Sequence, residues 1–324
     1  MNKKITFVLV LALAVFLVMG SASAGLFDFL GGDSGNTVKI GYLPSDHDAA
    51  LFVADAQGKF KEKNITTELV QFNNGGDLMT AMASGEVDVG YVGIAPVLSS
   101  VSKGVPVKVI SAAQTEGSGI VVTKDSGINS AADLKGKSIA TPGEASIQYV
   151  LLTYYLKQNN LSTDDLNVSA MKVPSMNDAL KTKQIDGIVT FQPYVSIAAN
   201  DTNNVVLEDS AKILPNHPCC VVVASDDFIK NHESTVKDII EIHKNATEFI
   251  NRELNAGNSS ALVKLLPDDI VSNSDLEAHS LESFPFISGI DNNFKADVDA
   301  FQKLEIDVGI LNKTVSHEDL YWQA

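Results

Sequence analysis

The side chains best suited to chemistry in this sequence are uncharged hydroxyls and amides that follow apolar, β-branched runs. Thr141 and Ser146 flank the segment Pro142–Ala145, and Gln148 comes two residues later. Hydroxyls and amides donate hydrogen bonds to the oxygen atoms of a small molecule. Ser146 is equally suited to capping the helix that follows, and Gln148 could face either a ligand or solvent. The pattern favours recognition of a small polar molecule.

A run of acid and imidazole groups, Asp46-His47-Asp48, suggests a metal site at first sight. Adjacent side chains in a loop rarely converge on one ion, and no partner ligands stand out in the sequence. An aspartate that caps a helix is the preferred interpretation, although His47 could still reach a binding cleft. We therefore expect no metal site and no cofactor.

The only two cysteines of the chain, Cys219 and Cys220, are neighbours. A disulfide between adjacent cysteines is strained, and the C-x-x-C spacing of redox and zinc motifs does not occur. His217 lies nearby, but no third catalytic group is evident, and Val221–Val223 indicate that Cys220 begins a buried strand. The motifs G-x-S-x-G and H-E-x-x-H and the P-loop do not occur either. We expect no enzyme activity, and Cys219 remains a residue that could line a ligand site.

Charge narrows the possible ligands and partners. The net charge of −16 at pH 7 argues against nucleic acid, because nucleic-acid affinity comes mainly from phosphate neutralisation by Lys and Arg. The only arginine, Arg252, falls in the predicted helix 235–254, far from every candidate loop. A ligand carboxylate clamped by a bidentate arginine is therefore not expected, unless lysine or backbone amides take its place.

Strands and helices must position these residues, and the apolar pattern alternates between the two. Residues 37–112 predict four strands separated by helices, as in βαβ units of a mainly parallel sheet. The same order returns over residues 137–191. Two equivalent α/β lobes are the simplest explanation, although chance similarity between βαβ units would give the same pattern. Beyond Asp226 the chain is mostly helical and could pack back on the first lobe, with helices predicted at 235–254, 259–265, 274–283 and 294–304.

The loops at the carboxyl ends of the strands are the expected ligand site. In open parallel sheets, ligands bind there, beside helix N-termini that present free N–H groups and a positive dipole end. Loops 44–48, 93–96, 141–148 and 192–194 have that position, and Gln114 lies at the crossing between the lobes. Facing lobes would aim several helix ends into one cleft, which suits a small oxyanion without an arginine. The candidate ligand-binding residues are Ser45, His47, Ile94, Ala95, Gln114, Thr141, Ser146, Ile147, Gln148, Gln192, Tyr194 and Cys219.

The N-terminus has the form of a secretory signal peptide. Lys3 and Lys4 precede an apolar run that ends in Ala22-Ser23-Ala24, and this run of about 15 residues is shorter than the roughly 20 of a membrane-spanning helix. We expect export to the periplasm or cell surface, with the run as a tether if it is not cleaved. The expected organisation is a signal peptide (1–24), a flexible linker (25–36), the first part of lobe 1 (37–114), lobe 2 with hinge strands (115–226) and a helical C-terminal part that returns to lobe 1 (227–324).

Several short motifs occur in a fixed order along nearly the whole chain after the signal peptide: Ile40–Pro44, Ala54–Phe60, Met82–Gly90, Asp133–Lys137, Gln192–Tyr194 and Phe228–Ile229. In this order the chain resembles the nitrate/sulfonate/taurine-type substrate-binding proteins of ABC importers. These belong to the type-II periplasmic-binding fold, in a superfamily that includes thiamine-pyrimidine-synthase-like proteins. Many relatives carry an acid before the proline of the fifth motif, where this chain has Gln192. Its loss favours an anionic or neutral ligand.

The resemblance implies an α/β, two-lobed fold with a ligand cleft between the lobes, a two-strand hinge and a helical C-terminal segment. It implies capture of a small oxyanion or sulfonate-like solute, delivered to ABC permease and ATPase subunits in the membrane by what we expect to be a monomer. Two alternatives stay open. One is an enzyme of the pyrimidine-synthase or menaquinone-pathway kind, which would work inside cells and so conflicts with a signal peptide. The other is an extracellular sensor partner.

Overall fold

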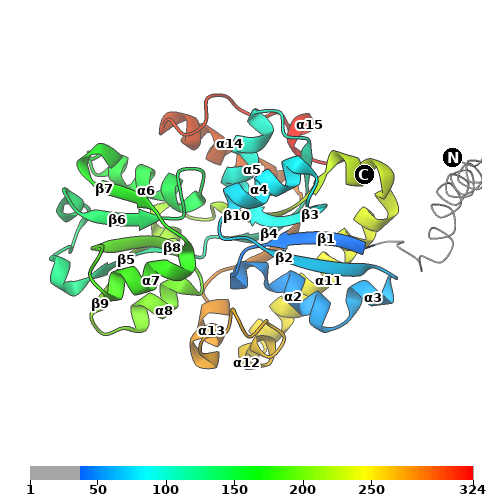
Figure 1. The fold of residues 1–324 in the computed structure, drawn as a ribbon, viewed down its shortest axis with the longest axis horizontal. Helices are drawn as coiled ribbons and strands as arrows, with labels where there is room; N and C mark the ends of the chain where they lie inside the picture. Colours follow the sequence, from blue (N-terminus) through cyan, green and yellow to red (C-terminus); the bar gives the residue numbers. More distant parts are fainter. Residues whose placement is uncertain (1–36, 324) are drawn as a thin grey trace, which may run out of the picture. The chain divides into compact units, whose positions relative to one another are not determined.

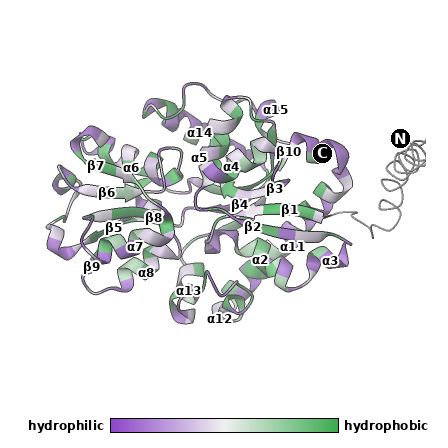
Figure 2. Cartoon of the chain, viewed as in Figure 1, coloured by the Kyte–Doolittle hydropathy of each residue, from purple (hydrophilic) through white to green (hydrophobic). Residues whose placement is uncertain are grey.

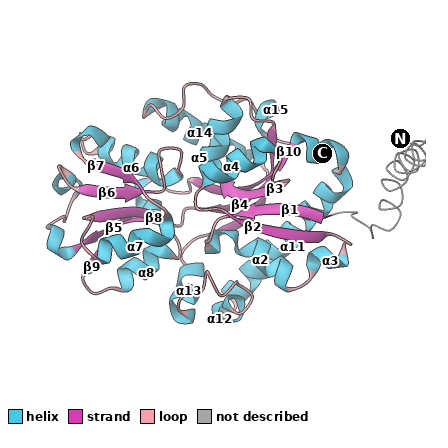
Figure 3. Cartoon of the chain, in the orientation of Figure 1, coloured by secondary structure: helices cyan, strands magenta, loops and turns pink. Residues whose placement is uncertain are grey.

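The computed structural model describes residues 37–323, which form two β-sheets with helices on both sides of each (Figures 1 and 3). The predicted signal peptide (1–24) and linker (25–36) lie outside the described residues. No helix within residues 37–323 combines the length and the apolarity that a membrane crossing requires.

The first sheet contains six strands, which span Thr37–Tyr42 (β1), Thr66–Gln71 (β2), Val89–Gly93 (β3), Val107–Thr115 (β4), Pro218–Ser225 (β10) and Phe286–Gly289 (β11). Their order across the sheet is β11-β4-β10-β3-β1-β2. β1 is parallel to β3, whereas β10 is antiparallel to both of its neighbours, β3 and β4. A strand from late in the sequence therefore lies in the middle of the sheet that the N-terminal strands begin.

The second sheet contains five strands, which span Ser118–Thr123 (β5), Ser138–Thr141 (β6), Asn167–Ala170 (β7), Gly187–Phe191 (β8) and Asn204–Asp209 (β9). Their order is β7-β6-β8-β5-β9. β6 is parallel to β7 and β8, and β5 is antiparallel to β8 and β9. We call the part of the molecule built on each sheet the first and the second lobe.

The helices connect successive strands and then form the C-terminal part of the chain. The first lobe carries Ala49–Ala56 (α2), Lys59–Glu62 (α3), Gly75–Ser84 (α4) and Ile94–Ser102 (α5), after the 3-10 turn Asp46–Asp48 (η1). The second lobe carries Ile147–Gln158 (α6), Val173–Lys181 (α7), Tyr194–Asn200 (α8) and Ser210–Ile213 (α9). Then follow Asp226–Asn231 (α10), Glu233–Asn255 (α11), Ser259–Val263 (α12), Ser274–Leu281 (α13), Asn292–Asp307 (α14) and His317–Leu320 (α15). α11 packs against α2, β4 and β11, so the C-terminal helices return to the first sheet.

Strand β5 shows how alternation along a strand divides the core. Ile120 and Val122 belong to the large cluster of buried apolar residues that extends through the first lobe. Val121, between them, belongs to a separate cluster with residues of α7 and α8. Successive side chains of a strand point to opposite faces, so β5 is apolar on both faces. Apolar residues concentrate along the strands of both lobes (Figure 2).

Both sheets are mixed: β1, β3 and β4 share one direction, and β6, β7 and β8 share another, as the prediction of mainly parallel sheets requires, but antiparallel pairing also occurs in each sheet. Apolar periodicity identifies a strand but does not reveal its direction, and β5 and β10 run antiparallel inside their sheets. The sequence pattern also missed β5, β9 and β11. β9 and β11 are edge strands with partly exposed residues, so their apolar signal is weak.

The chain crosses from the first lobe to the second between β4 and β5 and returns between α9 and β10. The two crossings touch. The backbone N–H of Glu116 donates to the carbonyl of His217 at 3.1 Å, and that of Asn216 donates to Glu116 Oε1 at 2.7 Å. The predicted hinge would lie at these two adjacent connections.

Candidate functional site

A cavity of about 280 Å³ is lined by residues of both lobes. The first lobe contributes the loop after β1, the starts of α4 and α5, and the start of β10 to the lining. The second lobe contributes the loop between β6 and α6 and the end of β8. The lining residues are Leu43, Ser45, His47, Asp48, Asn74, Gly75, Gly76, Gly93, Pro96, Pro142, Gly143, Glu144, Ala145, Ser146, Ile147, Gln148, Phe191, Cys219 and Cys220.

The loop after β1 is held by its own side chains. Ser45 Oγ accepts the backbone N–H of His47 at 3.1 Å and donates to the carbonyl of Gln192, in the second lobe, at 2.7 Å. The carboxylate of Asp48 turns back to accept the N–H of Leu43 at 3.0 Å. An aspartate, Asp48, does occupy the N-cap position of α2, as predicted, but its side chain makes no capping hydrogen bond, and Ser45 caps η1.

The loop between β6 and α6 has a comparable internal structure. Ser146 caps α6 by accepting the N–H of Tyr149 at 3.2 Å, and its hydroxyl donates to the carbonyl of Gly143 at 2.6 Å. The amide of Gln148 donates to Ser118 Oγ at 2.9 Å. The Ser146 hydroxyl proton is thus engaged within the loop, and backbone N–H groups at the start of α6 and the second amide proton of Gln148 remain as donors.

Three helices begin at the cavity. α4 starts beside Asn74–Gly76, α5 starts between Gly93 and Pro96, and α6 starts at Ile147, and all of these residues line the cavity. A helix N-terminus presents unpaired N–H groups and the positive end of the helix dipole. Among residues 37–323, no lysine or arginine lines the cavity. The helix N-termini, rather than lysine or arginine side chains, are therefore a source of positive potential at this lining, which also contains the acidic residue Glu144.

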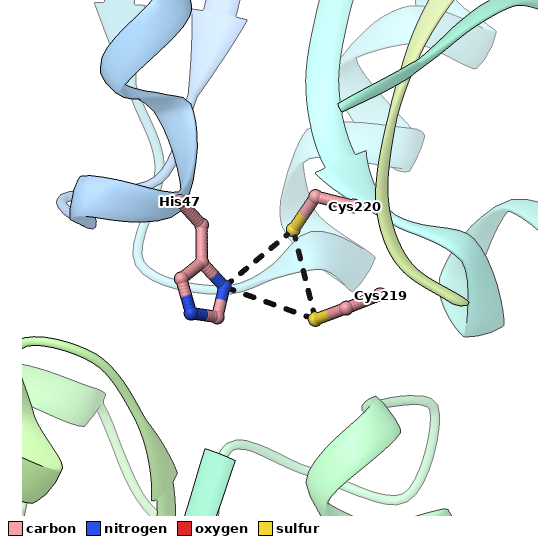
Figure 4. A group of neighbouring side chains, drawn as sticks. All are labelled: His47, Cys219 and Cys220. Carbon is pink, nitrogen blue, oxygen red and sulfur yellow. Dashed lines mark hydrogen bonds between the residues drawn. The ribbon is translucent and has the colours of Figure 1, made fainter. Parts of the chain in front are cut away.

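One wall of the cavity is a cluster of two thiols and an imidazole (Figure 4). His47 Nδ1 lies 3.8 Å from the sulfur of Cys219 and 3.8 Å from that of Cys220, and the two sulfurs are 4.0 Å apart. The three residues are 3%, 1% and 6% exposed. The rings of Phe191 and Phe284 pack against the imidazole with centroids 5.8 and 4.7 Å away. This wall was not predicted as a unit.

The charges of the cluster are coupled. Burial alone would lower the pKa of His47, but the Cys219 thiolate and nearby carboxyls raise it more, so it ends above its usual value. Burial would raise the pKa of Cys219, but the hydrogen bond from Cys220 and the charge of His47 bring it well below its usual value. The hydrogen bond to Cys219 and burial raise the pKa of Cys220. These shifts favour the charged forms of Cys219 and His47 and disfavour the thiolate of Cys220.

Two buried carboxyls lie next to the cluster. Burial raises the pKa of Asp46 to about 6 and that of Asp48 well above its usual value. Ser280 Oγ donates to Asp46 Oδ2 at 2.5 Å. Because burial disfavours the charged carboxylates, this side of the cavity carries less negative charge than its residue types suggest.

The structure brings six of the sequence-predicted residues together around the cavity, from both lobes. They are Ser45, His47, Ser146, Ile147, Gln148 and Cys219. The loop after β1 supplies two of them, the loop after β6 and the first turn of α6 supply three, as the strand-end rule predicts, and Cys219 comes from β10.

The other six predicted residues do not line the cavity. Ile94 and Ala95 are fully buried in the first turn of α5, and Gln114 is buried in β4. Thr141, at the end of β6, borders a different hollow with Tyr149. Gln192 donates to Ser283 Oγ at 3.2 Å and caps the N–H of Ser196, and Tyr194 begins α8.

Sequence reasoning missed the start of α4. The run Asn73-Asn74-Gly75-Gly76 follows β2, so the strand-end rule applied to it as well. A Cβ on Gly75 would lie 2.7 Å from the side chain of Pro96, so this glycine allows α4 and α5 to approach closely at the cavity. Cys220 and Phe191 were also missed, since neither residue lies in a predicted loop.

Two lobes with a cavity between them define the class of periplasmic-binding-protein folds, and solved structures bear this out. The chain superposes on the alkanesulfonate-binding protein SsuA from Xanthomonas axonopodis pv. citri bound to MOPS with a TM-score of 0.77 and 21% identity, over 90% of this chain and 99% of the other. The predicted fold class is confirmed.

The chain belongs to the NMT1-like family, whose model matches residues 32–266. It is 29% identical over 205 residues to the taurine-binding periplasmic protein of Escherichia coli strain K12, and this alignment spans 62% of each protein, less than two thirds of the relative. It is 27% identical over 237 residues to 4-amino-5-hydroxymethyl-2-methylpyrimidine phosphate synthase of Aspergillus parasiticus, covering 66% of this chain and 67% of the synthase. The relatives thus include both a substrate-binding protein and a pyrimidine synthase, the two groups that the sequence resemblance named.

Proposed function

We propose that this chain is the solute-binding component of an ABC-type importer, which captures a small oxyanion or sulfonate-like solute outside the cell and delivers it to membrane permease and ATPase subunits. The observation that carries the proposal is the convergence of three helix N-termini on a cavity lined by both lobes. Oriented backbone N–H groups bind oxyanions without a cationic side chain. The similarity to a taurine-binding protein supports the same ligand class.

The rest of the lining favours a ligand with an apolar part. Leu43, Pro96, Ile147 and Phe191 provide apolar surface in the same cavity. Its volume of about 280 Å³ lies just below the roughly 300–1,000 Å³ of pockets that hold drug-sized molecules. A short alkanesulfonate, with its sulfonate at the helix ends and its carbons against these side chains, fits this division better than a fully polar ion does.

The mechanism follows from where the donors lie. The starts of α4 and α5 belong to the first lobe and the start of α6 to the second, so a ligand that engages all three holds the lobes together. The hydrogen bond from Ser45 to the carbonyl of Gln192 adds a direct contact between the lobes. Ligand binding would then favour the closed form, and the permease would recognise that form.

A second candidate is an enzyme of the pyrimidine-synthase kind, and the match to the Aspergillus synthase favours it. A binding protein returns its ligand unchanged, whereas an enzyme converts it. Incubating the purified chain with each candidate ligand and analysing the mixture by mass spectrometry distinguishes the two. Recovery of unaltered ligand supports the binding protein, and a new product supports the enzyme.

Native mass spectrometry of gently purified protein, followed by a thermal-shift panel, tests the ligand class. The panel contains taurine, longer alkanesulfonates, nitrate, bicarbonate, pyrimidines and amino acids. We expect a sulfonate to raise the melting temperature, because a ligand that binds only the folded state stabilises it by RT ln(1 + [L]/Kd). Stabilisation by an amino acid alone would contradict the proposal, since the cavity lacks the arginine that commonly clamps a ligand carboxylate.

A further inference from the structure

We propose that His47, Cys219 and Cys220 form a binding site for a thiophilic divalent metal ion of the Zn²⁺ type, with one coordination position open to the cavity. The three donor atoms lie within 4.8 Å of one another, and all three residues line the cavity. Figure 4 shows the imidazole and both sulfurs pointing toward a common centre.

The spacing of the donors matches a metal coordination sphere. Zinc binds sulfur at about 2.3 Å and imidazole nitrogen at about 2.0–2.1 Å. For bond angles at the ion between tetrahedral and trigonal, two sulfur ligands then lie roughly 3.8–4.0 Å apart, and each sulfur lies roughly 3.5–3.8 Å from the nitrogen. The observed separations are 4.0 Å between the sulfurs and 3.8 Å from each sulfur to His47 Nδ1. An ion fits between the donors without a rearrangement of the cluster.

An irregularity in β10 makes this arrangement possible. Successive side chains of a regular strand point to opposite faces, so adjacent cysteines would normally diverge. The pairing of β10 with β4 shifts register between Pro218 and Cys220 and again between Cys220 and Val221. Such bulges redirect side chains, and here both sulfurs lie on the same side as His47.

His47 is oriented as a metal ligand usually is. Its Nε2 lies 3.1 Å from the carbonyl of Gly117, which can only accept, so Nε2 carries the proton and Nδ1 faces the sulfurs. Metal-ligating histidines typically donate their second N–H to a carbonyl in this way. A Cβ on Gly117 would collide with the imidazole, and its φ of +76° also favours glycine. Gly117 therefore positions the histidine.

Charge favours a divalent ion over a monovalent one. Two thiolates and a neutral imidazole carry two negative charges, so a divalent ion makes the complex neutral. The three ligands are 1–6% exposed, and a net charge at such a site is costly. The fourth position faces the cavity, where a water or an anion could bind.

A consequence that rests on the proposed function concerns the ligand. Lysine and arginine are absent from the described lining, so the metal would supply the one formal positive charge in the cavity. An oxyanion bound at the open position would be held by the ion and by the helix N-termini together. The affinity for a sulfonate should then depend on the metal.

Titration of the reduced, metal-free full chain with Co²⁺, without a histidine tag, tests the metal site. The chain contains only two cysteines, so any thiolate-to-cobalt charge-transfer absorption comes from this cluster. We expect the band to saturate at one equivalent and to disappear when Zn²⁺ displaces the cobalt. Cys219→Ser, Cys220→Ser and His47→Gln should each weaken Co²⁺ binding at least tenfold, whereas His279→Gln, at an exposed position, should leave it unchanged. Absence of the band, or an unchanged affinity in His47→Gln, would overturn the proposal.

Alkylation of the wild-type protein gives a test that needs no variant. Because the thiols are 1% and 6% exposed, a maleimide should label them slowly in EDTA, and one equivalent of Zn²⁺ should slow this labelling further. Equal labelling with and without Zn²⁺ would contradict the metal site. Sulfonate affinity measured with and without Zn²⁺ separates the metal site from the proposed function. If the metal binds but does not change the sulfonate affinity, only the link between metal and ligand is lost. If the chain binds a sulfonate but no metal, the metal site is wrong and the proposed function stands.

Discussion

Two buried histidines of the first lobe have similar surroundings but different partners. His47 is 3% exposed and His243, on α11, is 1% exposed. Nε2 of each lies within hydrogen-bond distance of a backbone carbonyl, Gly117 for His47 at 3.1 Å and Ala112 for His243 at 2.8 Å. The difference lies at Nδ1, which faces the two cysteine sulfurs in His47 and accepts from the hydroxyl of Tyr91 at 3.2 Å in His243.

The comparison shows that partners, rather than burial, decide what a buried histidine does. Burial lowers the pKa of His243 to about 4, so it stays neutral with both nitrogens satisfied. Burial acts in the same direction on His47, but neighbouring negative charge outweighs it and its pKa rises. His243 joins α11 to the sheet, whereas His47 presents a reactive group to a cavity. The following predictions separate these two roles.

The largest expected effect is the loss of stability in His243→Leu. This change leaves the Tyr91 hydroxyl buried without its partner and removes one donor to the Ala112 carbonyl, which keeps the hydrogen bond from Ser111 Oγ. We expect the free energy of unfolding to fall by about 2–4 kcal/mol. His47→Leu removes the hydrogen bond to the Gly117 carbonyl and the contacts with both sulfurs, but it leaves no buried hydroxyl without a partner and should cost less. Denaturant unfolding of both variants measures this. Equal losses would mean that both histidines are structural.

The pH dependence of stability should distinguish wild type from His243→Gln. The folded pKa of His243 is about 4, below the unfolded value of about 6.5. The unfolded state therefore takes up a proton first, and stability falls as the pH drops from about 6.5 toward 4. We expect the difference in unfolding free energy between the two proteins to shrink by a few kcal/mol over this range. A constant difference would show that His243 does not titrate in this way.

Gly117→Ala should disturb His47 and spare His243. The new Cβ would displace the imidazole, and we expect Co²⁺ affinity to fall by about 10–100-fold, as for other changes in groups that orient a metal ligand. Gly127→Ala is the matched control, because Gly127 has a similar φ of +72° with open space around its Cβ position. If both variants lost metal affinity alike, backbone strain rather than the position of His47 would be responsible.

The smallest effect is expected for Ser45→Ala. This hydroxyl joins the lobes through the carbonyl of Gln192 and caps the turn that carries His47. Its loss should lower the unfolding free energy by about 1 kcal/mol and weaken sulfonate binding slightly, because the closed form loses one contact. A large loss of ligand affinity would instead place Ser45 in direct contact with the ligand.

The sequence predicted the lobes and the strand-end loops because both depend on local patterns. The alternation of apolar residues located β1, β3, β6 and β8, and the loops after β1 and β6 followed from them. Direction and pairing were not available from periodicity, so the insertion of β10 between β3 and β4 was not foreseen. That insertion brings Cys219 to His47, which lies 172 positions earlier in the sequence.

The expectation of no metal site stays untested, and the proposed thiol and imidazole site is one that sequence spacing could not have revealed. Metal motifs are found in a sequence by short ligand spacings, and here one ligand is distant and the other two are adjacent. The adjacent cysteines lie where the pairing of β10 with β4 shifts register, and no pattern in the sequence marks that shift. The candidates Gln114 and Thr141 failed to reach the cavity for a related reason: the sequence places a residue on a strand but does not tell which side chain faces the ligand.

Titration calorimetry with a short alkanesulfonate tests the central claim, that the cavity between the lobes binds the solute. The wild type should bind one ligand per chain. Ala145→Trp, which places a large ring in the cavity lining, should abolish the heat of binding, whereas Ala83→Trp, at an exposed position of α4, should bind like the wild type. Undiminished binding by Ala145→Trp would show that the solute binds elsewhere and would contradict the account.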